Sequence, residues 1–207
     1  GLDNYIQMFE DYAVKKALIN TLIMMVCVIV FQVGIALILA LIVDTIKKGY
    51  KLFRTVFFFP VVISGTAIGL MFYLAYGYDY GLLNAIIIAF GGEKKVWITE
   101  NSALFMVLVP VIWQYVGFYF VIFLAALSKI PQDIYESALL DGITGTKRAV
   151  YITIPLIWDV IAVCISLAIV GTFKVFDIVY VITGGGPMDA SQVLGTYIYT
   201  VAFTGQN

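Results

Sequence analysis

Long uninterrupted runs of apolar residues dominate the chain and set its predicted architecture. A membrane-spanning helix needs about 20 mostly apolar residues. Four stretches meet this length, at about residues 17–43, 55–78, 101–128 and 154–182. The first three contain no charged residue, whereas the fourth contains Asp159, Lys174 and Asp177. Because backbone groups inside a bilayer must hydrogen-bond within their own segment, we expect these stretches to be helices. The pattern predicts an all-α, polytopic membrane helical bundle, with residues 1–207 forming a single transmembrane domain.

Composition supports a membrane protein and disfavours several other classes. The chain is 62% hydrophobic and 12% charged, with a mean hydropathy of +1.01. Soluble domains are about half apolar and about a quarter charged. The net charge of −1 predicts no nucleic-acid partner, and the absence of His disfavours acid–base catalysis and common metal sites. Cys27 and Cys164 both lie in apolar runs, which is typical of small buried side chains and not of a disulfide framework.

The basic residues predict the orientation of the chain, because cytoplasmic loops carry an excess of Lys and Arg. Seven of them fall in two loops that we place in the cytoplasm: Lys47, Lys48, Lys51, Arg54, Lys129, Lys147 and Arg148. Four fall on the opposite side: Lys15, Lys16, Lys94 and Lys95. The sequence therefore predicts a cytoplasmic loop at 129–151 and outer loops at 79–100 and 183–207. Both ends of the chain then lie outside, which a missing span at each end explains.

Two features interrupt this simple pattern. The apolar piece Leu82–Phe90 in the first outer loop is too short to span, so we expect it along the membrane interface or against the bundle. Pro60 and Pro110 fall inside predicted spans, which membrane helices tolerate where neighbouring groups bind the freed backbone. Kinks with close packing and mobile, cavity-lining segments are both compatible with these residues.

The cytoplasmic loop contains the clearest local signals in the sequence. Pro131 suits the first turn of a helix, Asp133 complements the positive helix end, and Gly142 suits the position just past the last turn. These signals predict a helix of about ten residues. A helix this short is not stable alone in water, so we expect it to need a docking surface. A second short segment is predicted at 144–150.

Within this loop the sequence resembles the inner-membrane component of binding-protein-dependent ABC importers. The signature of that family is Glu-Ala-Ala, three residues, Gly, nine residues and Ile-x-Leu-Pro. Here it reads Glu136-Ser137-Ala138, Gly142 and Ile152-Thr153-Ile154-Pro155 at the same spacing. Ser137 and Ile154 depart mildly from the signature, without a change of size that threatens the helix.

Other segments are similar to the carbohydrate-uptake branch of the family, which includes maltose, multiple-sugar and glycerol-phosphate permeases. They are Phe59-Pro60-Val61-Val62, Asp79-Tyr80-Gly81-Leu82-Leu83-Asn84, Trp113-Gln114, Gly117-Phe118 and Gly171–Asp177. The segment Thr183-Gly184-Gly185-Gly186-Pro187 resembles the first of the two paired permeases. The resemblance covers nearly the whole chain and implies the MetI-like fold. Members usually have six core spans, so we expect the first and last to be missing from the four seen here.

The resemblance implies how the chain works and with what. It predicts a non-catalytic, multi-pass permease of the prokaryotic cytoplasmic (inner) membrane. The ATPase-coupling residues would be Tyr135, Glu136, Ser137, Ala138, Asp141, Gly142, Ile152 and Pro155. No P-loop pattern is present, so ATP and Mg are expected on a partner ATPase and no cofactor on this chain. The implied partners are a second homologous permease, an ATP-binding cassette dimer, an external solute-binding protein, a sugar or related solute, and the lipid bilayer.

A substrate path is carried over from maltose-type permeases. It contains Gln114, Tyr115, Phe118, Gly171, Thr172 and Val175. Aromatic faces stack on sugar rings, and Gln or Thr side chains bind hydroxyl groups, yet plain helix packing explains the same residues. Lys174 and Asp177 are three apart and would form a local pair on one helix face, or tune substrate preference.

Two other classes of membrane protein fit the sequence less well than a permease does. A channel or secondary transporter would need no cytoplasmic docking helix, and would more often show a selectivity filter or paired intramembrane acids. An intramembrane enzyme would need a nucleophile–base pair or metal ligands within the spans, and the sequence offers neither.

Overall fold

A computed structural model describes residues 2–45 and 50–204, and all the regular structure in these ranges is helical. Lys47 and Lys48, which contribute to the predicted orientation, lie outside the described residues. The chain divides into two compact units. Unit 1 comprises Gly1–Val28, Ile63–Gln114 and Val170–Asn207, and unit 2 comprises Ile29–Val62 and Tyr115–Ile169.

Two helices are by themselves long and apolar enough to cross a membrane in the described part of the chain. The first runs over Tyr12–Asp44 and consists of α2 (Tyr12–Cys27), the π-helical turn η1 (Val28–Val33) and α3 (Gly34–Asp44). It follows the short helix α1 (Asp3–Glu10), and Asp11 caps it by accepting a 2.7 Å hydrogen bond from the Ala13 amide. The second is α7 (Ala103–Leu127), close to the predicted stretch 101–128.

The other two predicted stretches are bent. Helices α4 (Tyr50–Val62) and α5 (Gly65–Ala75) meet at 91°. In the last stretch, α11 (Trp158–Phe173) follows α10 (Ile154–Leu156) after a 74° bend. Thus 55–78 and 154–182 are not continuous helices.

A further break separates α11 from α12 (Asp177–Ile182), with residues 174–176 outside any helix. Lys174 and Asp177 therefore do not share one helix face, contrary to the expectation from their spacing. The backbone of Lys174 instead closes a turn on the Gly171 carbonyl.

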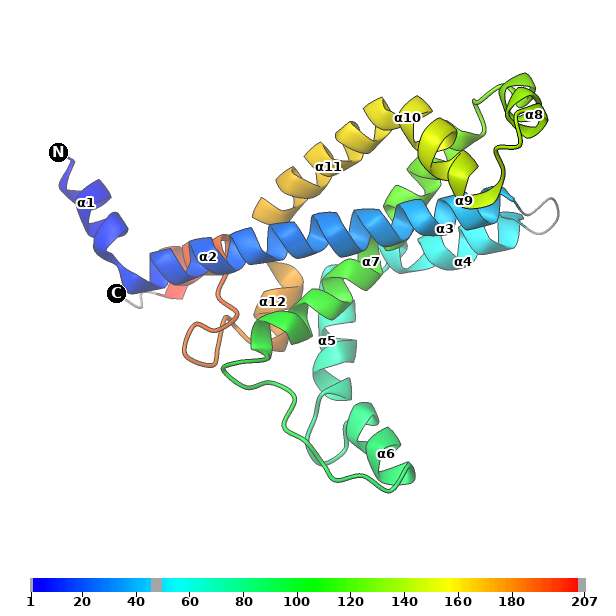
Figure 1. Ribbon diagram of the computed structural model, residues 1–207. Helices are drawn as coiled ribbons and strands as arrows, with labels where there is room; N and C mark the ends of the chain where they lie inside the picture. Colours follow the sequence, from blue (N-terminus) through cyan, green and yellow to red (C-terminus); the bar gives the residue numbers. More distant parts are fainter. Residues whose placement is uncertain (1, 46–49, 205–207) are drawn as a thin grey trace. The chain divides into compact units, whose positions relative to one another are not determined.

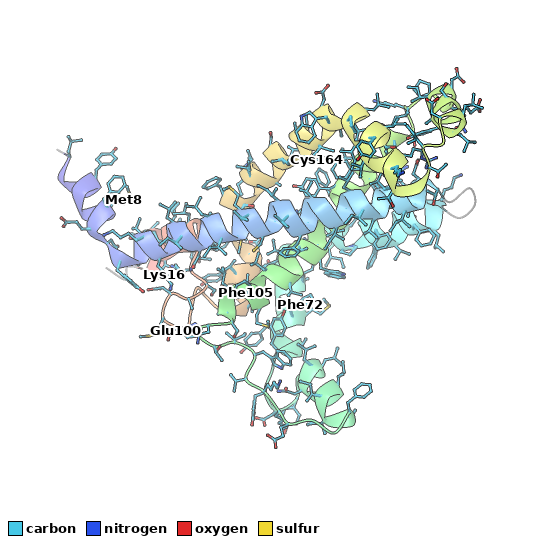
Figure 2. The ribbon with its side chains drawn as sticks, in the orientation of Figure 1. Met8, Lys16, Phe72, Glu100, Phe105 and Cys164 are labelled. Carbon is cyan, nitrogen blue, oxygen red and sulfur yellow. The ribbon has the colours of Figure 1, made fainter. Side chains whose placement is uncertain are left out.

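In unit 1, small residues let α5 approach α12 closely. A Cβ at Gly69 would lie 2.9 Å from the Val181 Cβ, so this position has no room for a side chain. Phe72, labelled on α5 in Figure 2, has its ring centroid 5.9 Å from that of Trp113. Both contacts are made by α5, the helix that follows the 91° bend.

The loop between α5 and α7 in unit 1 contains the short helix α6 (Leu82–Ala89), where the sequence has its short apolar piece. Figure 1 shows α6 after α5 along the chain, followed by an extended return segment toward α7. Asn84 fixes this segment: its amide donates to the carbonyls of Tyr78 and Lys95, and its carbonyl accepts from the Lys95 amide and the Trp97 indole. One buried side chain thus organises the whole loop.

Another loop of unit 1 connects α12 to α13 (Leu194–Tyr199), which continues into the π-helical turn η3 (Thr200–Thr204). The Asn20 amide, on α2, donates to the carbonyls of Asp189, Ala190 and Gln192 at 2.9–3.2 Å. The neighbouring Thr21 hydroxyl accepts from the Leu194 amide. Residues about 170 positions apart in the sequence are therefore bonded together in unit 1.

In unit 2, α4 packs against α7 at Gly117. A Cβ there would clash with the backbone carbonyl of Phe57, so the two helices approach as closely as glycine allows. Phe57 also meets Phe120 edge-on, at 5.3 Å between ring centroids. Phe120 and Phe123 are fully buried and form the centre of this unit.

Candidate functional site

Helix α8 (Gln132–Leu140) lies where the sequence predicts a short helix, and it begins and ends on identifiable residues (Figure 1). Pro131 occupies the position just before the first turn, one residue earlier than expected. Gly142 has a φ of +72°, its amide donates to Leu139, and the next amide, of Ile143, donates to Ala138. This is the Schellman arrangement, which stops a helix and satisfies its last carbonyl groups.

The two faces of α8 differ in exposure. Ala138 is buried and Ile134 is half-buried. On the other side, Leu139 is 62% exposed and Leu140 is 89% exposed. Glu136 and Ser137 are also exposed. The helix therefore offers an acidic and apolar strip to solvent while its opposite face is anchored.

Two pairs of residues spaced four apart differ in exposure on this helix. Ile134 and Ala138 both face inward, as their spacing suggests. Tyr135 and Leu139 have the same spacing, but Tyr135 is half-buried and Leu139 is exposed. The Tyr135 ring lies 4.6 Å from the guanidinium carbon of Arg148.

The second half of the motif lies in the following helical turns. Helix α9 (Gly145–Arg148) leads into the π-helical turn η2 (Ala149–Thr153), which contains Ile152. The Thr153 hydroxyl donates to the Arg148 carbonyl at 3.4 Å. Pro155 is exposed on α10, just before the 74° bend. The segment from Glu136 to Pro155 therefore connects the short helix α8 directly to a bent candidate span.

The predicted substrate-path residues are divided between the two units. Gln114 lies in unit 1 on α7, is 3% exposed, and donates to the Ile63 carbonyl at the break between α4 and α5. Tyr115 and Phe118 lie in unit 2, and the Phe118 ring meets Tyr119 edge-on. This hydrogen bond gives Gln114 a structural role, in addition to its predicted role in the substrate path.

The other three path residues lie in unit 1, around the end of α11. Thr172 is buried, Gly171 is exposed, and Val175 lies after the helix end. A Cβ at Gly195 would approach the Val175 carbonyl closely, so α13 begins against this segment. The structure thus places these residues at a helix break, where irregular backbone is typical of transport sites.

The sequence interpretation overlooked two groups that the structure brings together. Arg148 was counted only as an orientation charge, although its guanidinium faces Tyr135. No signal in the sequence marks Asn20, although it donates to three carbonyls of the loop between α12 and α13. Neither contact has a local sequence signal, because in each case the partners lie on different helices or loops. Within residues 2–45 and 50–204, no group of three or more Cys, Asp or Glu side chains is placed to hold a metal ion.

The chain matches the family of binding-protein-dependent transport system inner membrane components over residues 32–205. The probable ABC transporter permease protein YurN of Bacillus subtilis (strain 168) is 39% identical to it, over 99% of this chain and 72% of YurN. The lactose transport system permease protein LacF of Rhizobium radiobacter is 34% identical, over 98% of this chain and 70% of LacF. The trehalose/maltose transport system permease protein MalF of Thermococcus litoralis is 32% identical, over the whole chain and 69% of MalF.

A solved structure shares the fold. One chain of a bacterial alginate ABC transporter, crystallised with an alginate pentasaccharide-bound periplasmic protein, superposes with a TM-score of 0.90 at 24% identity. The match covers 99% of this chain and 73% of that chain. The predicted all-helical permease fold is therefore confirmed.

This chain belongs to the family of binding-protein-dependent transport system inner membrane components. It is a multi-pass, inner-membrane permease subunit of an ABC transporter, whose ATPase is a separate component.

Proposed function

We propose that this chain is a sugar-importer permease that receives the motion of its ATPase through α8. The observation that carries the proposal is the exposed strip of Glu136, Leu139 and Leu140 on a helix with a fixed end. Leucine side chains this exposed are typical of a contact surface. A capped, anchored helix transmits a rigid-body movement, whereas an unstructured loop absorbs it.

The proposed partners follow from the class of transporter. A dimeric ATPase, which carries ATP and Mg, docks on α8 from the cytoplasmic side. A second, homologous permease completes the path, and an external solute-binding protein delivers the solute. Relatives named for lactose and for trehalose/maltose support a sugar as that solute. The path residues Gln114, Tyr115, Phe118, Gly171, Thr172 and Val175 remain the candidates for contact with it.

The docking assignment is tested by capturing the cognate ATPase with the detergent-solubilised full-length permease. Glu136→Lys with Gly142→Asp is expected to abolish capture, because it reverses a surface charge and places a side chain at a positive φ. The matched control is Glu93→Lys with Gly91→Asp, since Glu93 is exposed and Gly91 also has a positive φ with open space around it. The control, on the predicted outer loop, should capture the ATPase like the wild type.

The outcomes separate the classes of protein. Normal capture by the double variant at Glu136 and Gly142 would move the ATPase contact away from α8. Wild-type permease that is folded but never captures the ATPase would favour a channel or secondary transporter. We expect the reconstituted complex to take up labelled oligosaccharide when ATP is supplied. It should not take up a labelled amino acid.

A further inference from the structure

The turn between α8 and α9 contains few interactions that fix one helix on the other. Residues 141, 142, 144 and 145 are exposed, and both Gly142 and Gly145 have a positive φ. The backbone bonds around the turn cap α8 or start α9, each within its own helix. In the ranges that the structure describes, no hydrogen bond or ion pair joins α8 to α9.

One side-chain contact does cross this turn. The guanidinium carbon of Arg148, the last residue of α9, lies 4.6 Å from the centroid of the Tyr135 ring on α8. Both side chains are half-buried. A guanidinium at this distance over an aromatic face is attracted by the ring quadrupole, and its planar shape stacks there better than an ammonium group does.

The Tyr135 hydroxyl does not explain the position of its ring. It is buried and has no hydrogen-bond partner among the described residues. Buried hydroxyl groups are normally hydrogen-bonded, so the ring is held here by its face and not by its polar end. Phenylalanine should therefore serve at this position as well as tyrosine.

Arg148 also interacts with a third element. Its charge acts on the carboxyl group of Asp44, the last residue of α3, which lies in the same unit. Arg148 thus has a favourable charge interaction with the acidic end of α3 in addition to its contact with the Tyr135 ring on α8.

We propose that Arg148 is a positioning residue that holds α8 in a fixed orientation through the face of Tyr135. This inference rests on the proposed docking of the ATPase on α8. When the ATPase moves α8, the Tyr135–Arg148 contact makes α9 and the helices that follow move with it. Without the contact, the turn at Gly142 and Gly145 bends, and ATP is hydrolysed without transport.

The test compares ring-removing with ring-preserving variants in the reconstituted complex with the cognate ATPase, second permease and binding protein. Tyr135→Leu and Arg148→Gln are expected to lower solute transported per ATP by about 3- to 10-fold, the range that a cation–π contact supports. Capture of the ATPase by the Arg148→Gln variant should persist, because Arg148 lies outside the exposed strip of α8. Tyr135→Phe and Tyr135→Trp are expected to remain near wild type, and Arg148→Lys to lie between. The double variant Tyr135→Leu/Arg148→Gln should be no worse than the poorer single variant.

Three outcomes would overturn the inference. If Tyr135→Phe lowers the solute transported per ATP as much as Tyr135→Leu does, the effect belongs to the hydroxyl group and not to the ring. Independent, additive losses in the double variant would show that the two residues do not act together. Wild-type coupling in both Tyr135→Leu and Arg148→Gln would show that the contact is dispensable. None of these three outcomes contradicts the proposed function, which is tested separately by capture of the ATPase. The proposed function is wrong if wild-type permease does not capture the ATPase through α8.

Discussion

At the scale of single residues, one asparagine on α2 helps to hold the loop between α12 and α13. Asn20 is 4% exposed, and its amide group binds three carbonyls within residues 189–192. The loop contains two residues other than glycine at positive φ, Met188 and Asp189. Such conformations cost of order 1–3 kcal/mol each and persist only where the surroundings hold them. The bonds from Asn20 to Asp189 and its neighbours contribute to that restraint, together with the bonds of Ser191 within the loop.

Asn20→Ala should therefore loosen the loop. Buried carbonyls left without a partner cost about 1–3 kcal/mol. We expect hydrogen–deuterium exchange of the amides in residues 184–193 to accelerate, by about tenfold for each 1.4 kcal/mol lost. Ser166→Ala is the control, because its hydroxyl is exposed and bonds only a carbonyl of its own helix. Unchanged exchange in Asn20→Ala would show that the loop is held by other contacts.

At the scale of helices, glycines set how closely pairs of elements approach. Gly69 brings α5 onto α12 in unit 1, and Gly117 brings α4 onto α7 in unit 2. Close backbone approach is a main source of helix association in membranes, where apolar side chains gain little from leaving lipid. These contacts lie within each unit and give each its own packed interior.

Gly117→Ala should destabilise unit 2. The new methyl group meets the backbone of Phe57, which cannot turn aside as a side chain does, so α4 must shift. Overpacking of this kind costs about 1–3 kcal/mol. We expect the midpoint of heat-induced unfolding in detergent to fall by about 2–4 °C for each kcal/mol. Gly34→Ala is the control, since nothing lies within 4 Å of its added Cβ. A midpoint unchanged by Gly117→Ala would contradict the packing of α4 on α7.

A polar contact joins α13 to the start of α2. The Tyr197 hydroxyl donates a 2.7 Å hydrogen bond to the Asp11 carboxylate. This bond, with a second from the Ala13 amide, lowers the pKa of Asp11 below its ordinary 3.8. The same bond raises the pKa of Tyr197 above 10.0. The contact therefore stabilises unit 1 between these two titrations.

The pH dependence of this contact has a definite sign. Because the folded pKa of Asp11 is lowered, its contribution is present above pH 3.8 and is lost as the pH falls through the folded value. Because the folded pKa of Tyr197 is raised, its contribution is present below pH 10.0 and is lost as the pH rises through the folded value. Tyr197→Phe should thus be less stable than wild type at neutral pH, with the difference shrinking at both extremes. A difference in unfolding midpoint that does not vary with pH would show that the titration of this pair contributes nothing.

At the scale of the whole molecule, the sequence predicts that the loops 79–100 and 129–151 face opposite sides of the membrane. Leu140, 89% exposed, lies in the predicted cytoplasmic loop, and Tyr80, 100% exposed, lies in the first predicted outer loop. Their similar exposure makes them a matched pair for chemical labelling. The orientation follows from basic residues alone, so it needs an independent test.

Labelling with a membrane-impermeant maleimide provides that test. In the full-length permease carrying Cys27→Ala and Cys164→Ala, we expect Tyr80→Cys to react in intact spheroplasts. Leu140→Cys should react only after the membrane is opened. The reverse pattern would invert the topology and exclude docking of a cytoplasmic ATPase on α8.

The sequence by itself determined the class of protein, the approximate positions of its apolar helices, and the start and stop of α8. These features are local: a 20-residue apolar run must span, and a glycine after an acidic and apolar turn ends a helix through its own backbone. The motif from Glu136 to Pro155 depends on spacing along one segment, so it can be recognised from the sequence alone. The family match and the shared fold confirmed the class.

Only the tertiary structure decided where the spans bend and which distant residues meet. Pro60 lies inside α4, yet that helix ends at Val62, where Gln114 from α7 binds the carbonyl of Ile63. Lys174 and Asp177 have helical spacing but belong to no common helix. Asn20 meets residues near 190, and Arg148 meets Tyr135 across a turn. Such contacts arise when helices pack, and packing depends on side-chain shape and backbone approach between segments, which hydrophobic periodicity does not record.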